Sequence, residues 1–254
     1  MATKKTTTKS STKARAAKKA APKKAPAKKA TKKAAKKSSA KKAVPAAAAD
    51  AGTPPKKTGS AAIAAAIIAD EAAPAKVAEQ TELLLDPRST TATKAARVVG
   101  EIANEKPELL VTHVEKFARS LTSKNKRVIQ AAAEALPAVA KLAPARVAKH
   151  LDTLKAAFDE TTLDGKDGLV RTFANLCTAS VAYQKRLEPV LAKALEIADG
   201  KTLLRWSQIV LPALKGEPHA RARSVVEDRL DRIPRATAQQ IATTLNFKLR
   251  VRYR

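Results

Sequence analysis

The sequence contains few of the residue types that mark secreted scaffolds, base-stacking surfaces or membrane spans. Its single cysteine, Cys177, excludes an intrachain disulfide framework and fits a reducing compartment. One Trp, two Tyr and four Phe are its only aromatic residues. No run approaches the ~20 apolar residues that a bilayer span needs, and no apolar segment follows the first lysines as a secretory signal requires. The sequence therefore predicts no membrane partner.

Patterns typical of catalytic and metal sites are also lacking. His113, His150 and His219 have no cysteine or aspartate at ligand spacing, and no nucleophile–base motif such as GxSxG occurs. The segments "DGKDG" and "DGKT" lack the glycine spacing of a phosphate-binding loop. They are better explained as turns in which Asp164 and Asp199 cap the following helix. We expect no enzyme, no metal and no cofactor.

Positive charge is abundant but unevenly distributed. The chain carries 50 Lys and Arg against 23 Asp and Glu, a formal net charge of +27. Residues 1–60 contribute +18, residues 61–90 contribute −3, and residues 91–254 contribute +12. This asymmetry predicts a disordered basic tail over 1–60, a linker over 61–88 and a folded body over 89–254, and it indicates a polyanionic partner.

Lysine doublets recur along the tail every four or five residues, with alanine, proline, serine and threonine between them. No side chain here repays the cost of ordering the backbone, so a partner must supply the free energy. Lysine is a mobile point charge that meets phosphates without fixed geometry, and the tail has no aromatic residue that could stack on bases. We expect it to bind a phosphate backbone without sequence preference, through Lys18, Lys19, Lys23, Lys24, Lys28, Lys29, Lys32, Lys33, Lys36, Lys37, Lys41 and Lys42.

The units "KKAAPKKAPAKK" and "KKATKKAAKK" resemble the Lys/Ala/Pro tails of linker histones and of bacterial histone-like proteins. The resemblance is compositional and covers 1–57. It implies chromatin or nucleoid binding, with DNA as the first expectation and RNA as an alternative. The compartment would be the nucleoid in a bacterium and the nucleus in a eukaryote. Targeting alone, or binding to another polyanion, remains open for the same segment.

After Pro87 the apolar residues recur at helical spacing. Segments led by proline begin at 107, 144 and 218, with a further start near 183, and "LPA" occurs at 136–138 and again at 211–213. A period near 37 residues, built from two helices, predicts an all-α solenoid. We expect an opening helix at about 90–104, helix pairs at 107–142, 144–180 and 183–216, and an ending unit from 218.

The form of this unit resembles HEAT repeats. Each has a first helix led by proline, a polar turn and a pair such as Val170-Arg171 or Leu204-Arg205 near the start of the second helix. The resemblance implies a surface that holds partners, without naming the partner. HEAT-like alkylpurine DNA glycosylases, which are also basic solenoids, suggest an enzymatic alternative in which Trp206 would serve, although Trp206 is equally explained as a packing residue.

Basic residues of the body form the second candidate site. If the repeats stack, cations in equivalent turns and helix starts would align into a stripe that a duplex backbone could meet. Bonding of these side chains within and between repeats is the alternative. The residues are Lys124, Lys126, Arg127, Arg171 and Arg205, with Lys166 and Lys201 in comparable places.

The C-terminal segment "NFKLRVRYR" alternates apolar and basic residues with a period of two, which predicts an extended segment rather than a helix. It would dock Phe247, Leu249, Val251 and Tyr253 on the last repeat or act as a basic arm. In either case we expect nucleic-acid contacts from Lys248, Arg250, Arg252 and Arg254.

The sequence therefore supports three hypotheses. The first is a non-enzymatic DNA-associated protein whose lysine-rich tail binds phosphates and whose body adds a basic surface or recruits a protein. The second is a protein-interaction scaffold whose tail serves only targeting or solubility. The third is the glycosylase-like enzyme, which release of bases from alkylated DNA would distinguish.

Overall fold

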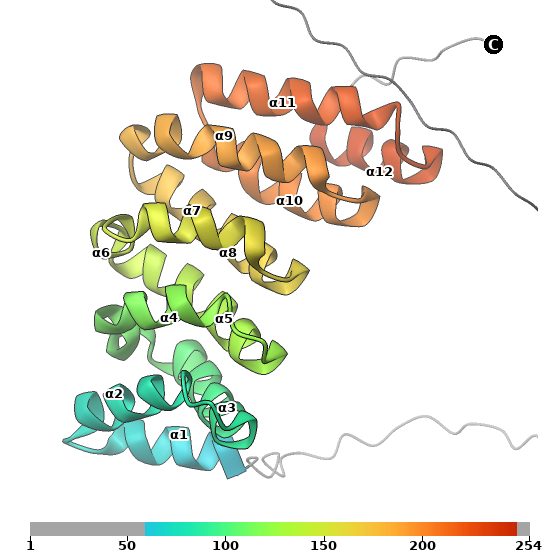
Figure 1. Ribbon diagram of the computed structural model, residues 1–254. Coiled ribbons are helices and arrows are strands. Elements are labelled where there is room, and N and C mark those ends of the chain that lie inside the picture. The colour runs from blue at the N-terminus through green and yellow to red at the C-terminus, as the bar shows by residue number, and fades with distance from the viewer. Residues whose placement is uncertain (1–58, 248–254) are drawn as a thin grey trace, which may run out of the picture. The chain divides into compact units, whose positions relative to one another are not determined.

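The computed structural model describes residues 59–247, which fall within one compact unit, Thr53–Arg254. The regular elements in this part of the chain are all helical and follow one another in chain order along a stack (Figure 1). The expected helical-repeat architecture is confirmed. None of the described helices is both long and apolar enough to cross a bilayer.

The stack consists of two rows of helices. The first helix of each pair is α2 (Ala73–Leu83), η1 with α4 (Pro107–His113, Val114–Ser120), α6 with α7 (Pro144–Ala148, Leu151–Glu160), α9 (Val181–Ile197) or α11 (Gly216–Leu230). The second helix is α3 (Ser89–Glu105), α5 (Lys126–Leu142), α8 (Leu163–Ala179), α10 (Gly200–Ala213) or α12 (Arg235–Leu245). Second helices pack on one another from pair to pair, most extensively α3 on α5 and α5 on α8.

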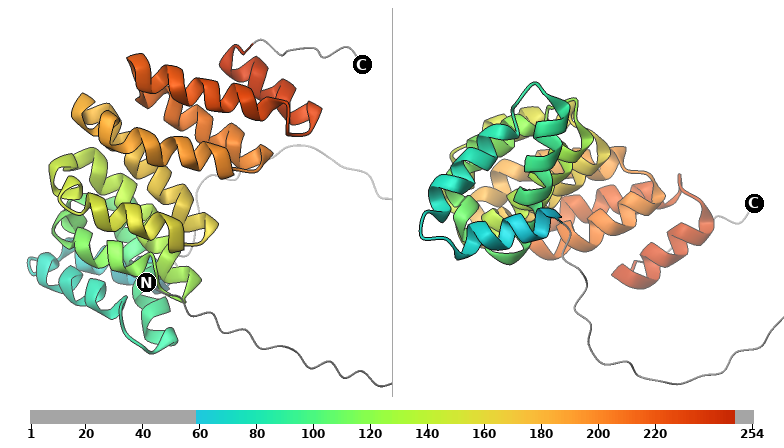
Figure 2. Two further views of the ribbon diagram at one scale, coloured as in Figure 1. Left: turned by 45° about the horizontal axis from the view of Figure 1, so that its top comes forward. Right: turned by 90° about the horizontal axis from the view of Figure 1, so that it is seen from below.

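The second helices keep a strict register through the first four pairs. Their N-cap residues are Arg88, Asn125, Thr162 and Asp199, each 37 residues after the last. Such a constant interval places equivalent residues of neighbouring helices side by side along the stack. Figure 2 shows the C-terminal pairs offset sideways from the N-terminal ones.

Two of the first helices are divided where the sequence predicted single helices. His113 and His150, also 37 residues apart, have φ of −107° and −103° with ψ of 17°, which interrupts the helix in each case. The second and third pairs thus contain three helical pieces, whereas the last two pairs contain two. Both forms occur among armadillo and HEAT repeats.

The linker expected over 61–88 is wrong for most of its length, because this range holds α2 and nearly all of α1 (Gly59–Ala69). Both helices pack against α3. Ala64, Val77 and Leu84 are buried with the rest of the core. Alanine-rich "AAIAAAIIA" has no amphipathic period, so only contact with α3 identifies its buried side. The described helices accordingly begin at Gly59, and the basic tail expected over 1–60 lies almost entirely outside the described residues.

A continuous apolar core runs between the two rows. Phe117, Phe158, Phe173 and Trp206 are its largest members, and each is at most 1% exposed. Phe247, just beyond α12, is also buried, and the guanidinium of Arg223 lies 4.5 Å from its ring centroid. With Phe247, five of the seven aromatic residues of the chain are buried in packing.

Candidate interaction surface

Most residues expected to contact nucleic acid lie outside the described residues. This holds for the twelve tail lysines between Lys18 and Lys42 and for Lys248, Arg250, Arg252 and Arg254. Of the C-terminal segment, only its beginning is described. Helix α12 ends at Leu245, and its C-cap residue Asn246 has the left-handed φ of 53°. Phe247 docks against α11 through Arg223.

The turn before α5 places three of the predicted cations at the edge of the stack. Lys124, Lys126 and Arg127 are all exposed. Between them Asn125 caps the helix by accepting a hydrogen bond from the backbone N–H of Arg127 at 3.0 Å, and its amide donates to Thr93 Oγ1 of α3 at 2.9 Å. The cap thus joins two neighbouring second helices and fixes the position of this basic turn.

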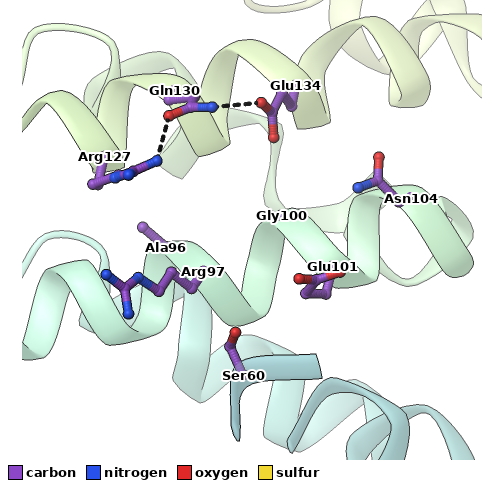
Figure 3. A pocket seen from close by; sticks show the side chains of 9 residues that line it. All are labelled: Ser60, Ala96, Arg97, Gly100, Glu101, Asn104, Arg127, Gln130 and Glu134. Carbon is purple, nitrogen blue, oxygen red and sulfur yellow. Dashed lines mark hydrogen bonds between the residues drawn. The ribbon is translucent and has the colours of Figure 1, made fainter. Parts of the chain in front are cut away.

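Arg127 belongs to a polar network on the surface of the second helices. Its Nη1 donates to Gln130 Oε1 at 3.0 Å, and Gln130 Nε2 donates to Glu134 Oε1 at 3.0 Å. These side chains face Arg97, Glu101 and Asn104 of α3 across an open hollow (Figure 3). The hollow carries two basic and two acidic side chains among its lining, so its charge is mixed rather than basic.

Arg171 and Arg205 meet at a buried carboxylate. Asp167 of α8 has a side chain only 5% exposed. Its Oδ2 accepts from Arg171 Nε at 2.9 Å and from Nη2 of the same guanidinium. Its Oδ1 lies 2.7 Å from Arg205 Nη2 and accepts from Trp206 Nε1 at 2.9 Å. One aspartate therefore fixes two predicted site residues and the single tryptophan.

The register of the second helices does not align the cations into the expected stripe. At the second position after the N-cap, successive helices carry Thr90, Arg127, Asp164 and Lys201. An acid therefore separates the two cations that are equivalent. Arg171 and Arg205 stand at different positions, nine and six residues after their caps.

Cations of the first helices are paired with acids of the preceding repeat. Lys116 of α4 bonds Glu82 of α2 at 2.9 Å, and Lys193 of α9 bonds Asp159 of α7 at 2.6 Å. Arg186 with Asp152, and Arg221 with Glu188, form longer pairs at 3.9 and 3.7 Å. Residues 59–247 contain 27 basic and 22 acidic side chains, so the described body has a net charge of only +5.

Asp164 and Asp199 were expected to cap the helices that follow them, and only Asp199 does so. Asp199 caps α10 by accepting from Thr202 N at 2.8 Å. Hydrogen bonding by the Thr202 side chain, and after it by this backbone N–H, lowers the pKa of the Asp199 carboxyl. Asp164 instead lies in the first turn of α8, whose N-cap is Thr162.

Burial determines the environments of Trp206, Cys177 and His113. Trp206 is fully buried and has no surface on which a flipped base could stack. Burial raises the pKa of the Cys177 thiol to about 12, and burial followed by the nearby Lys116 lowers the pKa of His113. Within residues 59–247 no three His, Cys, Asp or Glu side chains gather as a metal site would require.

The buried Asp167, together with Asn125 and Glu134, organises this surface and was not singled out from the sequence. Asp167 joins Arg171 four residues later, which is a local signal of an ion pair on one helix face. Its bond to Trp206 spans 39 residues, and no local pattern reveals such a contact. Asn125 could be recognised as an N-cap, since asparagine is favoured at that position.

Two solved structures share the fold at low sequence identity. One is a crystal structure of an engineered protein, with a TM-score of 0.55 and 22% identity, covering 72% of this chain and 83% of that one. The other is a designed armadillo repeat protein, with a TM-score of 0.51 and 16% identity, covering 75% and 92%. No family model matches the sequence, and no curated protein matches it. The comparisons thus show a helical-repeat fold similar to that of a designed armadillo repeat protein.

Proposed function

We propose that the protein is a non-enzymatic interaction scaffold tethered to nucleic acid, in which the solenoid holds a protein partner and the lysine-rich tail binds phosphates. The observation that carries this proposal is the distribution of charge. Residues 1–58 hold a net +18, whereas the described body holds +5 over more than three times as many residues. Electrostatic binding to a duplex scales with the cations delivered to phosphates, so the tail is the better nucleic-acid ligand.

The ion pairs of the body support the same division of roles. Arg171 and Arg205 share Asp167, and several first-helix cations face acids of the preceding repeat. Cations already bonded to carboxylates neutralise fewer phosphates than free ones. A solenoid with a mixed-charge surface is suited to a protein partner, as its resemblance to HEAT repeats also implies, although the fold itself does not name that partner.

The scaffold role is tested by site-specific photo-crosslinking in cells that make the protein. A photoreactive residue is placed at the exposed Gln130 of α5 or Gln208 of α10, and a matched control at the exposed Lys185 of α9. We expect protein adducts from the two second-helix positions that resist nuclease, and weaker adducts from position 185. Adducts consisting only of nucleic acid would contradict a scaffold role for the surface formed by the second helices.

A further inference from the structure

We propose that Arg171 and Arg205 form a two-arginine site that binds a single anionic side chain, carboxylate or phosphate, of a partner polypeptide. The inference deepens the scaffold proposal, on which its choice of a polypeptide rests. It starts from the arrangement around Asp167, where guanidinium groups from α8 and α10 are brought to the same carboxylate.

The charges at this point do not cancel. Two guanidinium groups contact one carboxylate. The carboxylate of Asp199 also interacts with Arg205, but it is balanced by Lys201, so a surplus of one positive charge remains. Asp167 is almost completely buried, whereas the side chains of Arg171 and Arg205 remain 48% and 55% exposed. The neutralising acid is thus inside, and the surplus charge is presented to solvent.

The donors at this point also exceed the acceptors. A guanidinium has five N–H groups in a planar fork. The carboxylate takes Nε and Nη2 of Arg171 and lies against Nη2 of Arg205. Several N–H groups of each fork therefore remain for an oxyanion, which arginine pairs bind with bidentate geometry.

The site is held in place before any ligand arrives. Asp167 is fixed by Trp206 Nε1, which donates to its Oδ1 at 2.9 Å from a fully buried indole. The two arginines therefore lose little side-chain freedom on binding, which lowers the entropic cost of the contact. A built and rigid pair of this kind differs from the exposed lysines of the neighbouring turns.

The surroundings favour an isolated anionic group over a nucleic-acid backbone. Along the second helices, the residues equivalent to Arg171 are Arg97, Glu134 and Gln208. A phosphate chain that followed this row from Arg171 toward Arg97 would meet the carboxylate of Glu134. A polypeptide with one acidic or phosphorylated residue, flanked by neutral or mixed side chains, avoids that repulsion.

The single tryptophan provides a direct readout. The indole N–H of Trp206 gives one resonance in a full-length chain labelled with ¹⁵N-tryptophan, and it reports on Asp167 through their hydrogen bond. The chain is titrated with sodium phosphate and with sodium acetate at pH 7, against sodium chloride of equal ionic strength. We expect a saturable shift with phosphate or acetate that chloride does not reproduce.

Matched variants locate the effect. Arg205→Gln is expected to weaken binding of the anion at least about ten-fold, since it removes a charged donor. Lys201→Gln, an exposed cation one turn earlier on α10, is expected to change the affinity less than about two-fold. Arg205→Lys keeps the positive charge and its pairing with Asp167, so this variant remains measurable even if Arg205→Gln does not fold. It should bind the anion with intermediate affinity.

Three results would overturn the proposal. They are the absence of a saturable shift with both anions, a shift that survives Arg205→Gln, or a 12-base-pair DNA duplex that shifts the indole resonance and loses that shift in Arg205→Gln. The scaffold role fails separately. If positions 130 and 208 gave no protein cross-links but the anion titration succeeded, the scaffold role would be wrong and an anion site would remain. If the cross-links formed but the titration failed, only the anion site would be wrong.

Discussion

Replacing Gly168 with alanine is expected to lower the free energy of unfolding by about 3 kcal/mol, a value at the upper end for overpacked interiors. Gly168 lies where α8 crosses α5. An added Cβ would stand 2.5 Å from both Cα and Cβ of Ala133 and closer still to its carbonyl oxygen. These are mainly backbone atoms, so relief requires the two helices to separate. This pair forms the most extensive helix contact in the described structure.

Gly100→Ala is the matched control for this substitution. Gly100 is also buried within a second helix, α3, but a Cβ there would meet only Glu134 Oε2 at 3.6 Å. Because alanine is a better helix former than glycine, this change is expected to stabilise by about 0.5–1 kcal/mol. Urea unfolding followed by circular dichroism measures both. Equal effects of the same sign would contradict the close packing of α5 and α8.

Replacing Asp167 with alanine is expected to cost about 2 kcal/mol of stability, mainly because the buried Trp206 N–H loses its acceptor, Asp167 Oδ1, and cannot reach water. The two arginines contribute less to this cost, since both are about half exposed and regain hydration when the carboxylate is removed. Trp206 fluorescence should change at the same time, because the indole environment changes.

Asp164→Ala serves as the control for Asp167→Ala. Asp164 is exposed in the first turn of the same helix, where an acid gains only about 0.3–1 kcal/mol from the helix dipole. Both variants remove one negative charge from α8. If the two lost equal stability in urea unfolding, the buried network around Asp167 would contribute nothing beyond its charge, contrary to the structure.

The repeat body could be predicted closely from the sequence, because its signals are local. Proline at 107 and 144 begins η1 and α6, and the expected opening helix at 90–104 corresponds to α3. The apolar period of 3.6 residues indicated that the chain after Pro87 is helical. Helices α1 and α2 were assigned to a linker. Alanine gives little contrast between the faces of α1, so only its packing on α3 reveals its role.

Whether the basic residues of the body align into a stripe could not be inferred from the sequence. The alignment depends on the register between neighbouring helices and on ion pairs with acids of other helices. Lys166 and Lys201 end similar "DGK" segments, yet the N-caps of their helices are Thr162 and Asp199. The two lysines therefore stand at different positions relative to the starts of their helices. Likewise, Arg205 pairs with an acid 38 residues earlier. Such pairings exist only once the repeats stack.

Duplex DNA binding measured across a salt series, with the full chain and with a chain lacking residues 1–58, tests the central claim most directly. If the tail neutralises about ten phosphates, the plot of log K against log salt for the full chain should have a slope near −9. Without the tail, the slope should be weaker than about −4, and affinity near physiological salt should fall by roughly 10³ or more. A chain lacking 1–58 that kept its affinity and slope would show that the solenoid is the DNA-binding surface, and would contradict the account.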